Sequence, residues 1–330
     1  MRARMSRRVE YDEYGGPEVL RLTEAPIPRP GEGEVLIQVV AAGLDHVDGY
    51  IRSGDYADEL PATFPERQGT SFAGIVLERG PGVRAFAVGA EVVGHDPAHG
   101  AHATHLVVPT GAIVKKPPTV PWEVAGGLYL AGTTALAIVQ SLRISGGVVV
   151  VTAAAGGVGH IECQLARLGG ATVIGVAGRQ NEDYLRSIGV VPVAYGDDVE
   201  ERIRTAAKGR PVDALIDNFD GYADVASALG VPAGRVVPSS RRREVELRLL
   251  TAAADDAEAR VLLADVVELL ATWGIRVLVS GFYAFEQLAE AAADLERRHS
   301  RGRVVVGMRT TAPAATYLQR RMRAEHERTP

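Results

Sequence analysis

Cysteine is almost absent from this chain, because Cys163 is the only one in 330 residues. A single cysteine excludes an internal disulfide and any zinc site built from several cysteines. Long apolar runs are missing too, so we expect no membrane-spanning segment, and no charged-then-apolar leader precedes the first strand pattern. These absences predict a cytoplasmic protein that does not associate with membranes.

The chain also has no excess of positive charge. Its formal net charge is −5, which gives no electrostatic reason to expect a nucleic-acid partner. Basic residues cluster around positions 2–8, 241–243 and 320–323, but such clusters are usually solvated faces. With 46% hydrophobic and 23% charged residues the chain is typical of soluble globular proteins, and its length favours two domains.

The most informative stretch begins with four consecutive valines at 148–151. A run of β-branched residues predicts a buried parallel strand. Small residues and glycines follow, and residues 160–168 then have the apolar spacing of a helix. Strand, glycine turn and helix form the context in which a dinucleotide fingerprint is informative, and the alternative is a tight turn that binds nothing.

The turn follows the Gly-x-Gly-x-x-Gly fingerprint, with Ala154 in place of the first glycine. Gly156 allows the backbone to approach a pyrophosphate closely, and Gly159 allows the helix to pack against the strand. The free N–H groups and the positive end of the helix dipole then bind the phosphates. The predicted cofactor-binding residues of this loop are Ala154, Gly156, Gly157, Val158 and Gly159.

The pattern of elements changes along the chain. Residues 5–118 are rich in short strand patterns, and residues 122–142 are helical. Strands then alternate with helices, which predicts a parallel sheet covered on both faces. The expected strands are 148–152, 172–176, 192–195, 214–217 and 235–238, with helices beginning near 159, 181, 198 and 220. A strand at 276–280, a helix at 284–297, a strand at 303–306 and a polar tail at 310–330 complete the prediction.

Several motifs in order along the chain resemble one family. They are YDEYGGPEVL at 11–20, AGLDHVDGYIRSG at 42–54, GVRAFAVGAEV at 82–92, AAGGVG at 154–159 and VDALIDN at 212–218. Together they are similar to the medium-chain dehydrogenase/reductase superfamily, in its zinc-free quinone oxidoreductase branch.

The resemblance implies an α/β protein with two domains. A GroES-like, partly open β-barrel domain would consist of residues 1–120 and 276–330, and a Rossmann domain with a doubly wound parallel sheet would span 121–275. Because members of this branch are usually dimers or tetramers, we also expect a homodimer or homotetramer.

The resemblance also argues against zinc. Zinc-dependent relatives have a cysteine ligand where this chain has Asp45, and a Gly-His-Glu motif where it has residues 69–71. We therefore predict no metal site. A rival site at His95, His99, His102 and His105 is disfavoured, because His102 and His105 would lie on opposite faces of one strand. Surface histidines are the expected alternative.

The predicted cofactor is NADP(H) rather than NAD(H). NAD-binding folds usually carry an acid at the end of the second strand, and this chain has Arg179 there. The forked donors of an arginine suit a 2′-phosphate, although an ordinary exposed arginine is the alternative. By resemblance Tyr195 closes over the cofactor phosphates, and Asn218 completes the predicted cofactor site.

Four residues are candidates for catalysis. The resemblance places Asp45 where asparagine is common beside the nicotinamide, and a carboxylate there would repel developing negative charge unless protonated or paired. Asp45 and His46 could instead exchange protons with the substrate, or face away from it. Tyr50 and Thr133 match residues near the substrate and the nicotinamide, with packing or capping as their alternative roles.

These observations predict an enzyme. The leading hypothesis is a zinc-independent, NADPH-dependent reductase that transfers hydride to a quinone or an α,β-unsaturated carbonyl, with a small-molecule substrate. The alternative is a non-redox cyclase, isomerase or lyase of a secondary-metabolite tailoring pathway, with proton transfer by Asp45 and His46. A third possibility is a binding protein without turnover.

Overall fold

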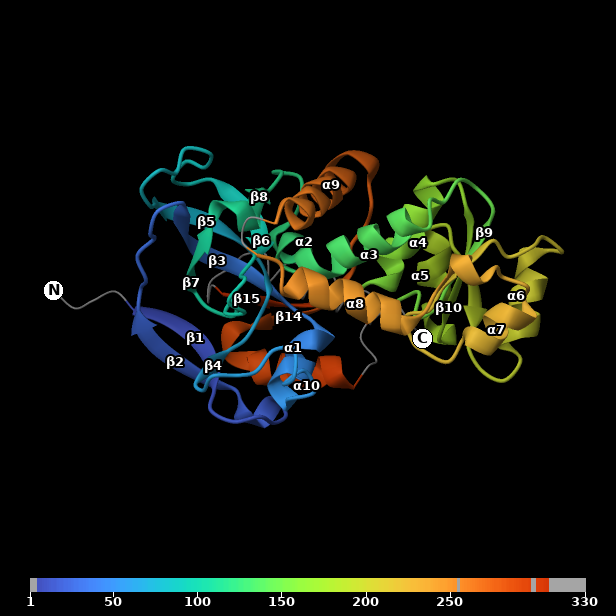
Figure 1. The fold of residues 1–330 in the computed structure, drawn as a ribbon, viewed down its shortest axis with the longest axis horizontal. Coiled ribbons are helices and arrows are strands. Elements are labelled where there is room, and N and C mark those ends of the chain that lie inside the picture. Colours follow the sequence, from blue (N-terminus) through green and yellow to red (C-terminus); the bar gives the residue numbers. More distant parts are fainter. Residues whose placement is uncertain (1–4, 254–255, 298–300, 309–330) are drawn as a thin grey trace. The chain divides into compact units, whose positions relative to one another are not determined.

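A computed structural model describes residues 5–253, 256–297 and 301–308, so the expected polar tail lies outside the described residues. The chain divides into two units (Figure 1). The first comprises Met1–Tyr129, Val279–Ser300 and Val304–Pro330, and the second comprises Leu130–Leu278 and Arg301–Arg303. The second unit thus begins and ends later than the sequence-based division at 121–275, and it includes the short segment at 301–303.

Strand β3 (Glu34–Leu44) organises the first unit, because both of its edges are paired. One edge pairs with β5 (Ser71–Arg79) through two register shifts. The other pairs first with β7 (His105–Pro109) and then with β15 (Arg303–Gly307). The resulting sheet has the order β14-β15-β3-β5-β6-β8, and its other strands are β6 (Glu91–His95), β8 (Ile113–Lys115) and β14 (Val279–Ala284).

The described part of this unit also contains a smaller antiparallel sheet and three α-helices. The sheet has the order β2-β1-β4, from β1 (Met5–Tyr11), β2 (Arg21–Pro26) and β4 (Glu66–Arg67). The helices are α1 (His46–Ser53), α2 (Trp122–Gly126) and α10 (Leu288–Glu296). Alternate residues of the strands form one core, including Val35, Ile37, Val39, Phe72 and Val304. The expected GroES-like barrel is confirmed.

The second unit contains a five-stranded parallel sheet in the order β11-β10-β9-β12-β13. Its strands are β9 (Val148–Val151), β10 (Thr172–Ala177), β11 (Val191–Ala194), β12 (Ala214–Ile216) and β13 (Val236–Val237). All four valines of β9 are fully buried, as a central strand requires. The strand order reverses between β9 and β12, and this confirms the predicted Rossmann fold.

Seven helices lie in the described part of the second unit. They are α3 (Tyr129–Ser141), α4 (Gly159–Leu168), α5 (Glu182–Ser187), α6 (Val199–Ala207), α7 (Ala223–Ala228), α8 (Ser239–Leu250) and α9 (Ala257–Trp273). Of these, α4, α5 and α6 pack on the strands of the sheet. The helical region predicted at 122–142 contains two helices, α2 and α3.

The strand expected at 276–280 begins only at Val279. Side chains of α4 bind the backbone of Arg276 and the N–H of Leu278, while the Leu278 carbonyl accepts the Arg303 N–H of β15 at 2.7 Å. The Gln164 amide exchanges two hydrogen bonds of 2.8 Å with the backbone of Arg276, and the Leu278 N–H donates to His160 Nε2 at 3.2 Å. Since these backbone groups already have partners, they do not extend the sheet.

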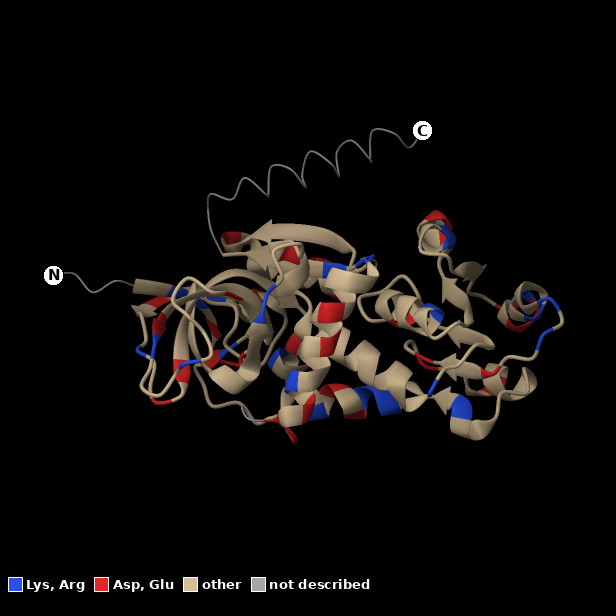
Figure 2. Ribbon diagram, turned by 90° about the horizontal axis from the view of Figure 1, so that it is seen from above, with Lys and Arg blue, Asp and Glu red and all other residues tan. Residues whose placement is uncertain are grey.

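Charged residues of both signs are interspersed on the ribbon (Figure 2). In the basic run on α8, Arg241 pairs with Glu244 at 2.8 Å and Arg242 pairs with Glu246 at 2.7 Å. Among the helices that the structure describes, none combines the length and the apolar character needed to span a bilayer.

Close packing of α2 on β3 yields a first prediction. A Cβ atom on Gly126 would lie 2.7 Å from the carbonyl carbon and the Cβ of Ala41, so Gly126→Ala should destabilise the protein by about 1–3 kcal/mol. Gly234→Ala is the matched control, because nothing lies within 4 Å of its Cβ position. Urea unfolding followed by tryptophan fluorescence should separate the two variants, and equal midpoints would contradict this account of the packing.

Candidate active site

The glycine loop is folded around the carbonyl group of Ala153. This residue has a φ of +46°, the left-handed conformation that L-residues rarely adopt. A Cβ atom on Gly159 would lie 3.0 Å from the Ala153 carbonyl carbon and closer still to its oxygen. Only glycine therefore fits at the start of α4, which agrees with the helix-packing role predicted for Gly159.

Gly156 also lies against this carbonyl. A Cβ on Gly156 would be 3.1 Å from the Ala153 oxygen, and the Gly156 N–H donates to that oxygen at 2.9 Å. Gly156, Gly157 and Val158 are half-buried and lead directly into the N-terminus of α4. The N–H groups of His160, Ile161 and Glu162 donate to Gly156 O and Val158 O, so a phosphate at this helix N-terminus would be bound by the N–H groups of residues 157–159.

Ala154 belongs to the packing of the sheet. Its N–H donates to Val176 O at 3.1 Å, and its methyl group lies 2.8 Å from where a Cβ on Gly175 would stand. Alanine fits in place of the first fingerprint glycine because β10 has a glycine opposite it. The N–H of Ala154 is therefore already used within the fold.

A polar cluster lies where β9 and β12 end. Thr152 Oγ1 donates to Asp217 Oδ1 at 2.9 Å, and the Asn218 N–H donates to Thr152 Oγ1 at 2.7 Å. The Asp217 carboxylate also accepts backbone N–H groups from Phe219, Asp220 and Tyr222 at 3.0–3.1 Å. These bonds fix the loop that carries Asn218 at the point where the strand order reverses, which is where α/β sheets bind ligands.

Arg179 and Tyr195 follow β10 and β11, and both are exposed. Next to Arg179, the guanidinium of Arg301 donates to Asn181 Oδ1 at 2.7 Å and to Gln180 O at 2.8 Å. Sequence reasoning missed Arg301, because it lies 120 residues beyond its partner. Its position adds a second cation to the end of β10, where a 2′-phosphate is expected.

The segment 301–303 also contacts the glycine loop. The Gly302 N–H donates to Ala155 O at 2.9 Å. Arg303 is buried, and its Nη1 lies 3.2 Å from where a Cβ on Gly157 would stand. The short Arg-Gly-Arg sequence thus places one cation beside the loop and another at the end of β10.

His160 connects α4 to the loop before it. Its Nδ1 donates to Gly156 O at 2.6 Å, while Nε2 accepts the Leu278 N–H. This pattern requires a neutral imidazole with its proton on Nδ1. Burial lowers the pKa of His160 to about 4, so the ring stays neutral near pH 7.

In the first unit, Asp45 is the N-cap residue of α1, His46 is the first residue of this helix and Tyr50 lies about one turn further along it. Asp48 Oδ2 accepts the Asp45 N–H at 2.8 Å, as in a helix cap, and Ser71 Oγ donates to Asp45 Oδ2 at 3.3 Å. Tyr50 packs edge-to-face with Tyr56 at a centroid distance of 5.7 Å. Asp45 is buried and forms a capping box with Asp48, so one of its roles is to hold the N-terminus of α1.

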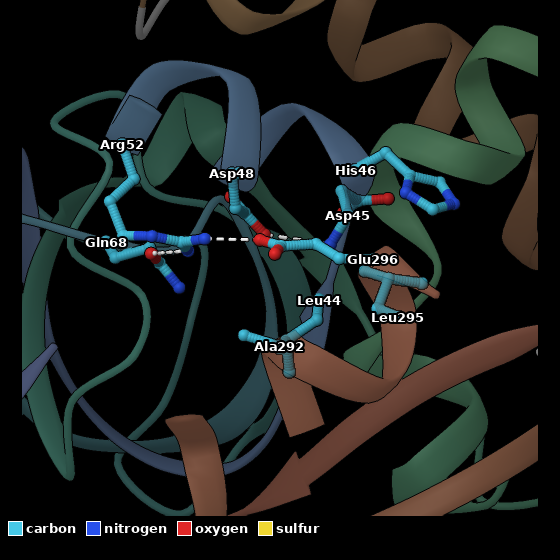
Figure 3. A pocket seen from close by; sticks show the side chains of 10 residues that line it. Leu44, Asp45, His46, Asp48, Arg52, Gln68, Ala292, Leu295 and Glu296 are labelled. Carbon is cyan, nitrogen blue, oxygen red and sulfur yellow. Dashed lines mark hydrogen bonds and ion pairs between the residues drawn. The ribbon is translucent and has the colours of Figure 1, made fainter. Parts of the chain in front are cut away.

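Arg52 anchors the other end of α1 and was not singled out from the sequence. Its side chain is buried, donates to Gln68 Oε1 at 2.9 Å and Gly15 O at 3.3 Å, and pairs with Glu296 of α10. Figure 3 shows this ion pair, with the His46 ring pointing away from it. The pocket around it is lined by Leu44, Asp45, His46, Asp48, Gly49, Arg52, Gln68, Ala292, Leu295 and Glu296.

Thr133 lies in the second unit, on α3, and is fully buried. Its Oγ1 donates to Leu130 O at 3.4 Å, a contact within the helix. The structure therefore brings Asp45, His46 and Tyr50 together in one unit and places Thr133 in the other.

Comparison with known proteins defines the family. Family models for the alcohol dehydrogenase GroES-like domain and for zinc-binding dehydrogenase match residues 31–118 and 190–306. A chloroplastic quinone-oxidoreductase of Triphysaria versicolor is 30% identical over 93% of this chain and 99% of its own length. The chain belongs to the quinone oxidoreductase family of medium-chain dehydrogenases/reductases.

Solved structures of relatives agree with this membership. A quinone oxidoreductase from Coxiella burnetii is 28% identical with a TM-score of 0.78, covering 93% of this chain and all of its own. A mycobacterial protein complexed with NADPH is 30% identical with a TM-score of 0.76, covering 92% of this chain and all of its own.

One of the two matching family models is named for zinc binding. Within residues 5–253, 256–297 and 301–308, no three histidine, cysteine, aspartate or glutamate side chains gather as a metal requires. The position expected for a zinc-binding cysteine is Asp45, and its neighbour is the Ser71 hydroxyl.

Two expectations for the histidines at 95–105 are wrong, namely that His102 and His105 share a strand and that these histidines lie on the surface. Strand β7 begins at His105, so His102 does not lie on the same strand. His95 and His102 are buried and not on the surface. His102 Nε2 donates to Gly43 O at 2.9 Å and burial lowers its pKa to about 4, while His95 stacks on Tyr129 at 4.1 Å.

The lowered pKa values of His102 and His160 predict that the folded protein loses stability in acid. Their folded pKa values lie below the unfolded value near 6.5, so the stability they contribute is present above pH 6.5 and lost as the pH falls toward 4. Each should lower the free energy of unfolding by about 1.4 kcal/mol per pH unit in this range. His160→Asn should reduce this slope in urea unfolding between pH 5 and 6.5. An unchanged slope would show that His160 is not a buried neutral base.

Proposed function

We propose that this protein is a zinc-independent, NADPH-dependent reductase that transfers hydride to a quinone or an α,β-unsaturated carbonyl compound. The observation that carries the proposal is the glycine loop at the switch point of the parallel sheet, folded so that Gly159 admits no side chain. Relatives solved in complex with NADPH, the mycobacterial protein and quinone oxidoreductase of Escherichia coli, support this cofactor.

The charges at the end of β10 favour NADPH over NADH. Arg179 is exposed there, and Arg301 lies against the following residues. The nearby carboxylates belong to α5. The end of β10 thus offers guanidinium groups to a 2′-phosphate, while the carboxylates of Glu182 and Asp183 already pair with Arg186.

In the proposed reaction the protein binds the cofactor, orients the substrate and supplies a proton to it. Bound at the glycine loop, NADPH would supply the hydride. We assign the Tyr50 hydroxyl to donate to the substrate oxygen, and the exposed His46 to deliver the proton that follows. Ser71 donates to Asp45 and so offsets part of its negative charge beside a developing enolate. Family membership also leads us to expect a homodimer or homotetramer.

The role of Arg179 gives a binding test. Arg179→Ala should raise the Kd for NADPH about tenfold or more, because a charge-assisted hydrogen bond to the 2′-phosphate is lost. The Kd for NADH should stay unchanged, and Arg241→Ala, which removes an exposed arginine of α8 paired with Glu244, serves as the control. Fluorescence titration measures both. Equal losses for the two nucleotides would contradict 2′-phosphate recognition by Arg179.

Turnover separates the reductase from the non-redox alternative. With a benzoquinone or an enone as acceptor, NADPH should be consumed in a one-to-one ratio to product. Asp45→Asn should retain turnover within about tenfold, because asparagine keeps the helix cap and removes a repulsive charge. Product formed without loss of NADPH, and abolished in Asp45→Asn, would instead support proton-transfer chemistry by Asp45 and His46.

A further inference from the structure

Glu162 is a buried acid in the first turn of α4, the helix that follows the glycine loop. Glu162 is fully buried on α4, and the Asn218 amide donates a hydrogen bond to its Oε2. The same amide donates to Thr152 O at 3.2 Å. Glu162 therefore contacts the cluster at the ends of β9 and β12 without belonging to the loop itself.

Two acceptor atoms in this cluster have no donor among the described residues. Glu162 Oε1 and Asn218 Oδ1 are both buried without a hydrogen-bond partner. The Asn218 amide has already used its two N–H donors. A proton on Glu162 would add the missing donor, and an unsatisfied buried acceptor is costly. The hydrogen-bond pattern therefore favours the neutral carboxylic acid.

The surrounding charges agree with this state. Burial raises the pKa of Glu162 to about 7, against the opposing effects of the Asn218 hydrogen bond and the Arg242 cation. Arg242 of α8 is itself bound to Glu246 at 2.7 Å, and Glu246 disfavours a second carboxylate. The adjacent thiol of Cys163 is buried, and the Asp217 carboxylate is occupied by Thr152 and three backbone N–H groups.

We propose that Glu162 is a positioning residue for the dinucleotide site, holding the Asn218 side chain as a neutral acid and weakening dinucleotide binding when it ionises. An ionised Glu162 would place a negative charge in the helix turn whose positive end is expected to hold the phosphates. It would also leave the Asn218 oxygen without a donor. The inference rests on the proposed function, because it assumes that a dinucleotide binds here.

The test is a fluorescence titration with NADPH at pH 7.0, 7.5, 8.0 and 8.5. The Kd of the parent should rise about tenfold across this range, because the protonated fraction of a group with a pKa near 7 falls from about one half to a few per cent. Glu162→Gln should bind as tightly as the parent at pH 7 with no such rise, since glutamine keeps a donor. Glu200→Gln, an exposed acid of α6 paired with Arg204, is the control and should behave as the parent.

A second measurement needs no variant. Calorimetric titration of the parent with NADPH at pH 7.5, in two buffers of different ionisation enthalpy, should show net proton uptake on binding. No uptake, or the same pH dependence in Glu162→Gln as in the parent, would overturn the role of Glu162. Absence of NADPH binding to either protein at every pH would remove the proposed function, and the inference would fall with it.

Discussion

The close approach of α4 to the Ala153 carbonyl is the constraint on which the second unit depends. Gly156 and Gly159 both lie against this group, and neither position leaves room for a side chain without displacement. The conformation of the turn between β9 and α4 is therefore fixed. The N-terminus of α4 lies next to β9 and β12, the strands between which the strand order reverses. The polar cluster at Thr152, Asp217 and Asn218 and the returning segment at 301–303 are arranged around that turn.

The first unit positions α1 by a comparable set of fixed contacts. β3 pairs along both edges, and α1 begins directly after it with the Asp45 cap. Arg52 holds the other end of α1 through three separate partners, one of them on α10. The Arg52 guanidinium is buried, so loss of Glu296 would leave a buried charge without its counter-charge. The candidate catalytic residues Asp45, His46 and Tyr50 thus stand on a helix anchored at both ends.

Local patterns in the sequence predicted most helices and strands, but they could not predict contacts between distant segments. The valine run, the glycines and the strand–helix alternation each depend on neighbouring residues, so the Rossmann sheet and its loop could be predicted. Arg301, Arg303 and the side-chain contacts that replace a strand at 276–278 depend on residues more than 100 positions apart. The burial of His102 and Glu162 could not be predicted from the sequence either, because burial depends on the whole fold.

The central claim is that a dinucleotide binds at the turn between β9 and α4. Hydrogen–deuterium exchange with and without NADPH tests it most directly, because bound phosphates protect the backbone N–H groups that hold them. We expect slower exchange in peptides covering residues 152–162 and 177–181, with little change in β1 and β2. Protection confined to the first unit, or no protection at 152–162 under saturating NADPH, would contradict the account.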